Sequence, residues 1–398
     1  MGFEIVCLSP TRWRQLWQRP QQVLSRMAAL GHRILYVDPP TVGSRKDVSR
    51  YLHEQSAWDL RLRERLPNLT TLEPVRFMQG SFAGRLRRDE VADLNTLVRL
   101  VGLRRAMERL GFTEPVLWVY LPEAARFAGR LGESMLVYDC VDMFPAFPGA
   151  TPEKARGAEE LARRADVMFC ASRSLLAVNQ PLNPRAELVP NAVDVDFFDL
   201  SLATRPLPVL ADRGPVVGFL GAIYEWVDTG LLAGVATGRP DWTIAMVGPV
   251  AGEHAALRGC PNVVWCGPVE YTDVPAYIGA MDVCLIPFAA SEVTYHSNPI
   301  KVYEYLAAGK PVVATPLPEL EQFADVLTLA AGVEATVSAI DACLREEATA
   351  AGPALRGKRR EAVRRHHWDQ RVAQMLAAME DHRKGVGALA HHRVPADH

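Results

Sequence analysis

One short stretch of the sequence pairs a lysine and a glutamate at a spacing that could bind a nucleotide. Lys301 and Glu304 lie three residues apart in a predicted helix, and Pro299 suits its first turn. This helix follows the predicted strand Val283–Pro287. The free amides of Ile300 and Lys301, the helix dipole and the lysine ammonium would then favour a diphosphate. Glu304 could accept both hydroxyls of a ribose. The alternative is a capped helix with a Lys–Glu pair on its surface.

Two aspartates follow another predicted strand. Asp139 and Asp142 come directly after Met135–Tyr138, at the carboxyl end of that strand. Ligands of parallel sheets bind at this end. Asp142 could act as a general base on an acceptor hydroxyl. Asp139 could contact the acceptor or a phosphate, or it could be a helix cap or loop anchor.

Arginines and tryptophans crowd the loop after the first predicted strand. In TRWRQLWQRP, Arg12 and Arg19 could contact a phosphate or an acidic acceptor, because guanidinium groups bind such groups in bidentate geometry. Trp13 and Trp17 could stack on a sugar ring. The alternative is a surface loop whose tryptophans pack onto their neighbours.

Short apolar runs alternate with helical patterns along the chain, which predicts parallel sheets with helical crossovers. The pattern stops in the Pro-containing segment 200–215 and then restarts. We therefore expect an α/β protein with two Rossmann-like, doubly wound domains facing across a cleft. The expected division is 1–205 for an N-terminal domain, 206–365 for a C-terminal domain, 366–382 for a C-terminal helix, and 383–398 for a flexible tail.

Four segments, in order, resemble the GT-B glycosyltransferases of family 4. They are WQRPQQVLSRMAALGHRILYVDPP, ELVPNAVDVDFF, NVVWCGPVEYTDVPAYIGAMDVCLIPF and SNPIKVYEYLAAGKPVVAT. Within family 4, the chain is similar to a branch of teichuronic-acid-type and cell-surface polysaccharide transferases. The resemblance covers roughly residues 1–382 and implies the GT-B fold and transfer of a sugar from a nucleotide sugar. It implies that domain 1–205 binds the acceptor, that domain 206–365 binds the nucleotide sugar, and that helix 366–382 crosses back to the first domain.

The resemblance also assigns roles to residues around the lysine and the glutamate. Glu304 matches the second glutamate of the family's Glu, seven residues, Glu motif, which binds the donor ribose. His296 stands where the first glutamate contacts the transferred sugar, and a histidine could bind a sugar hydroxyl or carboxylate instead. The residues that match the loop and helix start under the diphosphate are Ser297, Asn298, Ile300 and Lys301.

Other donor contacts implied by the resemblance lie at glycines and one aromatic residue. Gly221 and Gly248 match turns at the nucleotide pocket, and the segment with Val269 and Tyr271 matches the frame of the base. Tyr271 could stack on the base or be a half-exposed surface residue. The family's Arg and Lys after the first glycine turn are replaced by AIYEWVD. We therefore expect the positive charge that stabilises the leaving diphosphate to come from Lys301, or also from Arg12, Arg14 or Arg19.

Composition excludes several classes of protein. The 398-residue chain has 44 Lys and Arg against 46 Asp and Glu, which argues against a basic nucleic-acid-binding protein. Its seven cysteines form no CxxC pair, and no DxD pair suggests a metal site. We expect no metal and no cofactor, with the nucleotide sugar bound as a substrate.

The same composition bears on location. No targeting segment or membrane-spanning apolar run is evident, so a cytoplasmic protein is expected. Residues 83–112 hold seven arginines against four acidic residues, with leucines interleaved. Such a helix could contact an anionic membrane face peripherally, or it could be a solvated helix face. The oligomeric state stays open.

The leading hypothesis is therefore a metal-independent glycosyltransferase. A hexosyl group would pass from a UDP- or GDP-sugar to a small-molecule, glycan or lipid-linked acceptor. Asp142, His296 and Lys301 would be its catalytic residues. The alternatives are a GT-B sugar-nucleotide epimerase or hydrolase, and a catalytically silent nucleotide-sugar-binding protein. A Rossmann dehydrogenase is disfavoured because no GxGxxG follows a strand.

Overall fold

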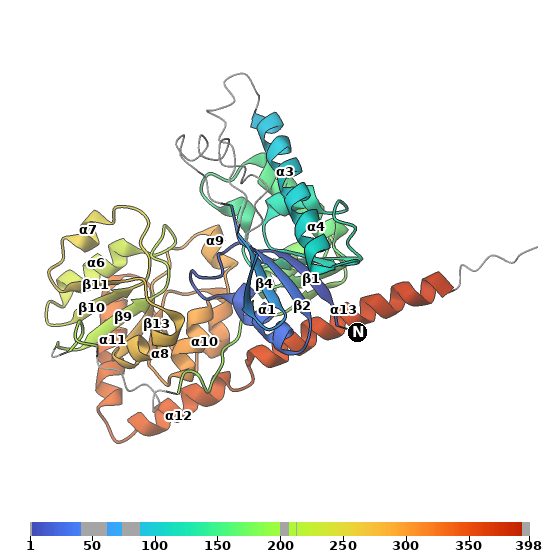
Figure 1. Ribbon diagram of the computed structural model, residues 1–398. Coiled ribbons are helices and arrows are strands. Elements are labelled where there is room, and N and C mark those ends of the chain that lie inside the picture. Colours follow the sequence, from blue (N-terminus) through green and yellow to red (C-terminus); the bar gives the residue numbers. More distant parts are fainter. Residues whose placement is uncertain (1, 41–61, 74–87, 200–206, 212, 392–398) are drawn as a thin grey trace, which may run out of the picture. The chain divides into compact units, whose positions relative to one another are not determined.

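The computed structural model describes residues 2–40, 62–73, 88–199, 207–211 and 213–391 (Figure 1). The chain divides into two compact units, each built around one sheet. The first unit comprises Met1–Ala171, Leu175–Val189 and Val372–His398, and the second comprises Ser172–Ser174 and Pro190–Arg371. The predicted α/β class with two doubly wound domains is confirmed.

The sheet of the first unit has the order β3-β4-β2-β1-β5-β6-β7-β8 in the described part of the chain. All neighbouring strands are parallel except the pair β3 and β4. The fully buried Ile5 pairs with Ile34 on one side and Val116 on the other. The strands are β1 (Glu4–Leu8), β2 (Arg33–Val37), β3 (Leu62–Leu66), β4 (Leu69–Leu72), β5 (Val116–Val119), β6 (Met135–Cys140), β7 (Val167–Cys170) and β8 (Ala186–Leu188).

Helices connect these strands. Helix α1 carries Pro20 in its first turn and ends before Gly31, whose φ of +91° is the left-handed conformation that terminates helices. The helices are α1 (Arg19–Ala29), α3 (Arg88–Leu110), α4 (Pro152–Arg164), α5 (Arg173–Asn179) and α13 (Trp368–His391), with short 3₁₀ helices η3 (Pro122–Phe127) and η4 (Phe144–Ala146).

The second unit has an entirely parallel sheet in the order β11-β10-β9-β12-β13-β14 within the described residues. Its strands are β9 (Val216–Leu220), β10 (Thr243–Val247), β11 (Val263–Gly267), β12 (Val283–Ile286), β13 (Val312–Ala314) and β14 (Thr328–Leu329). Its helices are α6 (Thr229–Gly238), α7 (Ala255–Arg258), α8 (Val274–Gly279), α9 (Glu292–Tyr295), α10 (Ile300–Ala307), α11 (Val333–Glu347) and α12 (Gly352–Val363), with 3₁₀ helices η6 (Tyr271–Asp273) and η7 (Pro318–Phe323).

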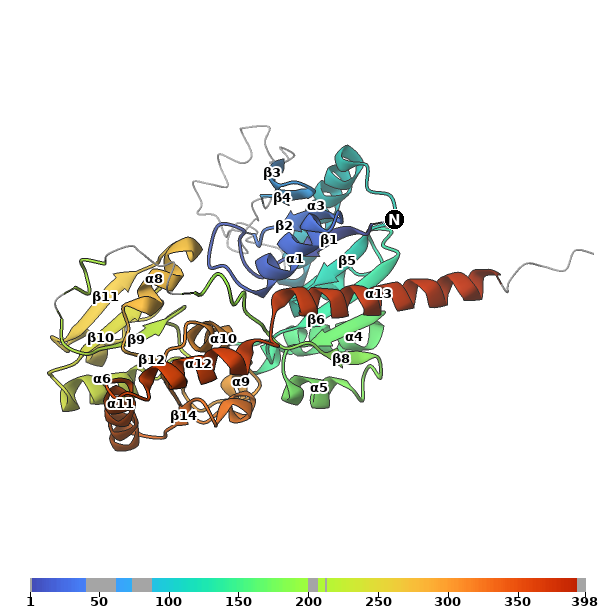
Figure 2. The same cartoon turned by 90° about the horizontal axis from the view of Figure 1, so that it is seen from below.

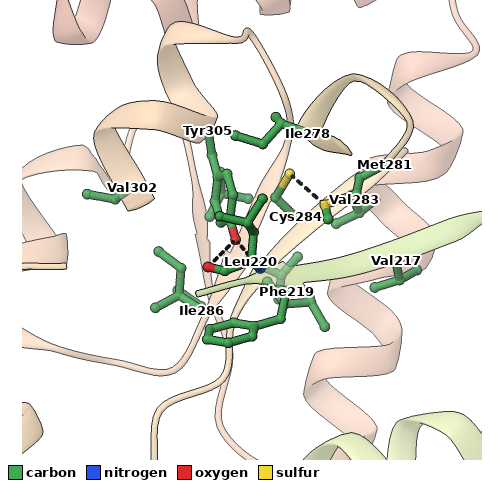
Figure 3. Packing of buried hydrophobic residues seen from close by; sticks show 14 of the residues in the cluster. Val217, Phe219, Leu220, Ile278, Met281, Val283, Cys284, Ile286, Val302 and Tyr305 are labelled. Atoms are coloured by element: carbon green, nitrogen blue, oxygen red, sulfur yellow. Dashed lines mark hydrogen bonds between the residues drawn. The ribbon is translucent and has the colours of Figure 1, made fainter. Parts of the chain in front are cut away.

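Helix α10 is anchored on both sides. Its buried Tyr305 accepts a hydrogen bond at Oη from the amide of Leu220 in β9, at 2.8 Å (Figure 3). Val302 packs into the same apolar cluster, and α12 packs against α10 (Figure 2). Residues from α10 are therefore held at a defined position relative to the central strand β9.

The structure differs from three sequence predictions. The first boundary falls between Val189 and Pro190, earlier than the predicted 205/206, and Ser172–Ser174 belong to the second unit. Residues 383–391 are helical, not a flexible tail, because α13 continues to His391 and Arg383 stacks over the Phe3 ring at 4.4 Å. Residues 392–398, part of the linker 200–215 and residues 83–87 of the basic segment lie outside the described residues.

Candidate functional site

The second sheet reverses its strand order beside β9. Strands β10 and β11 lie on one side of β9, whereas β12, β13 and β14 lie on the other. The connections after β9 and β12 therefore diverge at the carboxyl edge, which is where doubly wound sheets bind ligands. The turn at Gly221 follows β9, and helices α9 and α10 follow β12.

Three glycines line this edge. Gly221, Gly248 and Gly267 end or follow β9, β10 and β11, with φ values of +141°, +137° and +71°. A Cβ on Gly248 would lie 2.0 Å from the carbonyl oxygen of Gly221, so no other residue fits there without movement. The strand ends therefore present bare backbone, which a phosphate or a ribose can approach closely.

Lys301 lies beside the first of these glycines. A Cβ on Gly221 would lie 3.1 Å from Lys301 Cε and 3.3 Å from Nζ. The ammonium lies 4.8 Å from the ring centre of Phe288 and 5.0 Å from that of Phe219, a cation–π arrangement. It has no hydrogen-bond or carboxylate partner among the described residues, and burial lowers the pKa of Lys301 to about 8. An anionic ligand would give this charge the partner it lacks.

Glu304 lies one turn later and is 5% exposed. Burial raises the pKa of its carboxyl group to about 7, and the charge of Lys301 opposes that shift. The two side chains nevertheless form no ion pair, and the carboxylate of Glu304 has no hydrogen-bond partner among the residues that the structure describes. The alternative of a surface Lys–Glu pair is therefore not what the structure shows.

His296 terminates the short helix α9. Its side chain is buried, and ring Nδ1 has no hydrogen-bond partner among the described residues. Burial lowers the pKa of the imidazole, against the opposing charge of Glu292, so the ring is neutral at pH 7. A buried polar atom without a partner is costly, and a ligand hydroxyl would supply the missing bond.

The loop after His296 leads into α10. The side chain of Ser297 donates to the carbonyl of Thr294 at 2.8 Å, and Ile300 begins the helix half-buried. The sequence predicts Asn298 as a donor contact, yet its Nδ2 donates to the buried carboxylate of Glu319 at 3.2 Å. Its Oδ1 is buried without a partner in the described part of the chain. This side chain therefore anchors the loop at least as much as it serves a ligand.

The predicted frame of the base lies after β11. Val269 is half-buried against the apolar core. The ring of Tyr271 is stacked on Phe197 with centroids 4.8 Å apart and an angle of 7°. One face of this tyrosine is therefore already covered, which limits the predicted stacking on a base to its other face.

The sequence predicts Arg19 and Asp139 as contacts to acceptor or phosphate, and the structure gives them another role. Arg19 Nε lies 3.1 Å and 3.0 Å from the two carboxylate oxygens of Asp139, and Nη2 lies 2.9 Å from Oδ1. Nη1 donates to the carbonyl of Val189 at 2.8 Å. Arg19 is 3% exposed and Asp139 is fully buried. They form a structural ion pair of the first unit, because each neutralises the other away from solvent.

Asp142 and Arg12 also lie in the first unit, but they are not part of the ion pair between Arg19 and Asp139. The half-buried carboxylate of Asp142 has no partner among the described residues, and burial raises its pKa to about 7. A carboxylate with this pKa suits a general base near neutral pH. Arg12 is half-buried. Trp13 is buried edge-on against Tyr36 and Trp17, as the packing alternative expected.

Two residues that hydrogen-bond to the loop at His296–Asn298 belong to no motif that the sequence shows. Ser172 Oγ donates to the carbonyl of His296 at 2.7 Å, and Glu319 accepts from Asn298. They lie 124 and 21 residues from their partners along the chain. Only the folded chain reveals such contacts, because neither residue belongs to a motif.

Helix α3 contains the described part of the basic segment 83–112. In α3, Arg99 lies over the Phe127 ring at 4.5 Å, so this arginine packs inside the fold. None of the described helices combines the length and hydropathy of a membrane span. Within the described ranges, no group of three His, Cys, Asp or Glu side chains is arranged to hold a metal ion.

Comparison with known proteins relates the segment that contains these residues to a family. Residues 214–346 match the family "Glycosyl transferases group 1", and this range contains the glycine edge and α10. This segment of the chain is therefore similar to group 1 glycosyltransferases. The resemblance to family 4 is thereby confirmed. The chain is 31% identical over 220 residues to TuaH of Bacillus subtilis (strain 168), a protein named for teichuronic acid biosynthesis as a glycosyltransferase. That match covers 51% of this chain and 55% of TuaH, so the chain spans about half the length of this curated relative.

Solved structures support the GT-B fold over nearly the whole chain. Sucrose-phosphate synthase of Thermosynechococcus elongatus matches with a TM-score of 0.72 and 16% identity, covering 97% of this chain and all (100%) of that one. HepE of Anabaena, in complex with UDP and glucose, matches with a TM-score of 0.63 and 16% identity, covering 95% and 100%. A trehalose-phosphate synthase of Burkholderia xenovorans, in complex with glucose-6-phosphate, matches with a TM-score of 0.67 and 13% identity, covering 96% and 100%.

Proposed function

We propose that this protein transfers a hexosyl group from a nucleoside diphosphate sugar to an acceptor. The observation that carries the proposal is a pair of ionisable groups, the half-buried Lys301 and the buried Glu304, that have no hydrogen-bond or ion-pair partner among the described residues and lie beside the bare backbone at Gly221. A cation suits a diphosphate, and a carboxylate suits two ribose hydroxyls. The UDP complex of the structurally similar HepE supports a UDP-sugar as the first donor to test.

The roles of the donor residues follow from their chemistry. The first turn of a helix has backbone N–H groups without intrahelical partners, so the amides of Ile300 and Lys301 can hold the diphosphate. The Lys301 ammonium stabilises the negative charge that develops on the leaving group. Glu304 holds the ribose, and His296 offers Nδ1 to a sugar hydroxyl. Val269 and Tyr271 frame the base.

The acceptor is assigned to the first unit in this proposal. Asp142 takes the proton of the acceptor hydroxyl as that oxygen attacks the anomeric carbon, and the nucleoside diphosphate leaves. Its carboxylate, with a pKa near 7, can exist in the basic form at neutral pH. The acceptor class remains a small molecule, a glycan or a lipid-linked glycan. We further propose metal-independent transfer, with Lys301 and the helix amides opposite the diphosphate, in a cytoplasmic protein with peripheral membrane contact.

The test begins with the wild-type protein and a panel of UDP, GDP, UDP-hexoses and GDP-hexoses in a thermal-shift assay. At 100 times Kd, a bound nucleotide stabilises the native state by about 2.7 kcal/mol, which raises the melting temperature measurably. Glu304→Gln and Lys301→Met should lose this stabilisation. Glu321→Gln, which alters an exposed carboxylate, should keep it. If no nucleotide stabilises the protein, or if both site variants respond like the wild type, the proposal is wrong.

Product analysis distinguishes transfer from the other reactions of the same site. Incubation with the stabilising donor should yield nucleoside diphosphate in proportion to added acceptor. Free sugar released at the same rate without any acceptor would instead indicate a hydrolase, and an altered nucleotide sugar would indicate an epimerase. Binding without any turnover would indicate a silent binding protein.

A further inference from the structure

A buried carboxylate lies behind the loop that leads into α10. Glu319, in the 3₁₀ helix η7, is 2% exposed. Its Oε1 accepts the backbone amide of Arg173 at 2.7 Å, and its Oε2 accepts Nδ2 of Asn298 at 3.2 Å. The guanidinium of Arg173 lies 3.5 Å from the same Oε2. Both carboxylate oxygens are therefore occupied by groups of the second unit.

Two further side chains hold the same loop by its carbonyls. The fully buried Ser172 donates to the carbonyl of His296 at 2.7 Å. Asn191 donates to the carbonyl of Asn298 at 2.6 Å. Together with Glu319, these contacts hold the loop at both ends of the tripeptide His296–Asn298. The peptide planes next to the start of α10 are consequently restrained.

A buried carboxylate needs this many donors because its desolvation is costly. An apolar residue would fill the same space without that cost. Unlike an apolar residue, the carboxylate of Glu319 accepts hydrogen bonds from two specific N–H groups, Nδ2 of Asn298 in the loop and the backbone amide of Arg173. The arrangement restrains a segment that carries the unpartnered imidazole nitrogen of His296 and ends at the first amides of α10.

We propose that Glu319 is a positioning residue for the donor site, holding the loop 296–299 through Asn298 in concert with Ser172. Its consequence for binding rests on the proposed function, whereas its effect on the loop does not. Glu319 itself contacts no donor. It keeps His296 and the amides of Ile300 and Lys301 where a donor diphosphate and sugar can meet them.

The decisive variant is Glu319→Gln. The amide keeps the shape of the side chain but offers one oxygen and one NH₂ group, so either the amide of Arg173 or Nδ2 of Asn298 loses its acceptor. Glu321→Gln is the matched control, because it makes the same change on the same 3₁₀ helix at an exposed position. Ser172→Ala is the second variant and removes the donor to the carbonyl of His296, together with the contact of the same hydroxyl to Ser174 Oγ at 3.1 Å.

Hydrogen exchange followed by mass spectrometry tests the loop without any ligand. In Glu319→Gln and in Ser172→Ala, peptides covering residues 296–302 should exchange at least about tenfold faster than in the wild type, while those of β9 and β10 keep their protection. Glu321→Gln should match the wild type. Unchanged exchange over 296–302 would overturn the proposal, and so would equal loss of protection throughout the second unit. If Glu319→Gln does not fold, Ser172→Ala decides the matter by the same criterion.

Titration with UDP and GDP tests the consequence for the donor. For the nucleotide that binds the wild type, Glu319→Gln should raise Kd about tenfold, because the loop loses a hydrogen bond to a charged carboxylate that holds it in place. Glu321→Gln should leave Kd unchanged. An unchanged Kd in Glu319→Gln would overturn positioning of the donor site. A wild type that binds neither nucleotide would refute the proposed function, while the exchange experiment would still judge the restraint of the loop.

Discussion

Two ionisable side chains of helix α10 carry charge at a cost to the stability of the folded protein. Lys301 and Glu304 lie one helical turn apart, and burial shifts both pKa values toward the neutral form. They do not relieve that cost by pairing with each other. Groups arranged in this way are typical of sites where a ligand supplies the missing partner.

Glu304→Gln should therefore stabilise the free protein while removing nucleotide binding. The pKa of Glu304 is raised from 4.5 to about 7, so the folded protein holds this proton more tightly than the unfolded chain. Its contribution to stability consequently falls as pH rises from about 4.5 to about 7, and the full cost applies above pH 7. We expect Glu304→Gln to gain about 1–3 kcal/mol in urea unfolding at pH 8 and much less at pH 5. A loss of stability at pH 8 would mean that the carboxylate has a favourable partner.

The two aspartates after β6 should respond in opposite ways to the same substitution. Asp139→Asn leaves Arg19 buried with a weakened partner, and breaking such a pair costs about 3–5 kcal/mol. Asp142→Asn removes a carboxylate that has no side-chain partner in the described part of the chain and whose pKa burial raises to about 7, so the free energy of unfolding at pH 8 should increase, as for Glu304→Gln. Turnover should be lost in Asp142→Asn. Urea unfolding and acceptor-dependent release of nucleoside diphosphate check both expectations, and a stable, inactive Asp139→Asn would restore a direct role for that residue.

At the scale of elements, the site depends on how strand ends meet one helix. Strands β9 and β10 end in glycines whose backbones touch, and α10 is bound to β9 through Tyr305 and Leu220. Helix α10 carries Lys301 and Glu304, and the glycines after the strands leave the backbone beside Lys301 uncovered. Neither element forms the site without the other.

Gly248→Ala should disturb this junction. The added Cβ would lie 2.0 Å from the Gly221 carbonyl oxygen, and the φ of +137° is strained for alanine, so we expect a loss of about 2 kcal/mol or more. Nucleotide binding should weaken as well, because Gly221 lies against Lys301. Gly238→Ala is the control, since a Cβ there meets nothing within 4 Å, and it should stay within about 1 kcal/mol of the wild type. Urea unfolding and nucleotide titration measure both, and equal stability of the two variants would contradict the close contact.

At the scale of the whole molecule, most of the last helix belongs to the first unit, whereas the residues that precede it in sequence belong to the second. Helix α13 starts in the second unit, but Val372 and the residues after it belong to the first. Its buried Met375 and Met379 contribute to that unit's interior, and Gln374 donates to the carbonyl of Leu188 in β8.

Truncation after Arg371 should therefore destabilise the first unit selectively. Hydrogen exchange should show lost protection in β1, β6 and β8, while β9 and β12 keep theirs, because large buried side chains are removed from only one core. Met375→Ala should act in the same direction at a cost of about 2–4 kcal/mol. Truncation after His391 is the control and should leave both units protected. Uniform loss of protection in both units would contradict the assignment of this helix.

The sequence by itself determined the fold class, the similarity to glycosyltransferases and the candidate donor segment. Apolar runs that alternate with helical patterns predict a parallel sheet from short stretches of sequence. The segment SNPIKVYEYLAAGKPVVAT places a lysine and a glutamate at helical spacing after a strand. These features depend on neighbours within a few residues, so they are visible along the chain.

The tertiary structure alone decided which charges have partners. Arg19 and Asp139 are 120 residues apart and neutralise each other, whereas the adjacent Lys301 and Glu304 do not. Ser172 donates to the carbonyl of His296, 124 residues away along the chain. The chain enters the second unit for good after Val189, not at the proline-containing segment, and returns to the first unit after Arg371. The physical reason is that pairing, burial and the resulting pKa shifts depend on contacts between distant residues. Residue type and spacing along the chain do not specify those contacts.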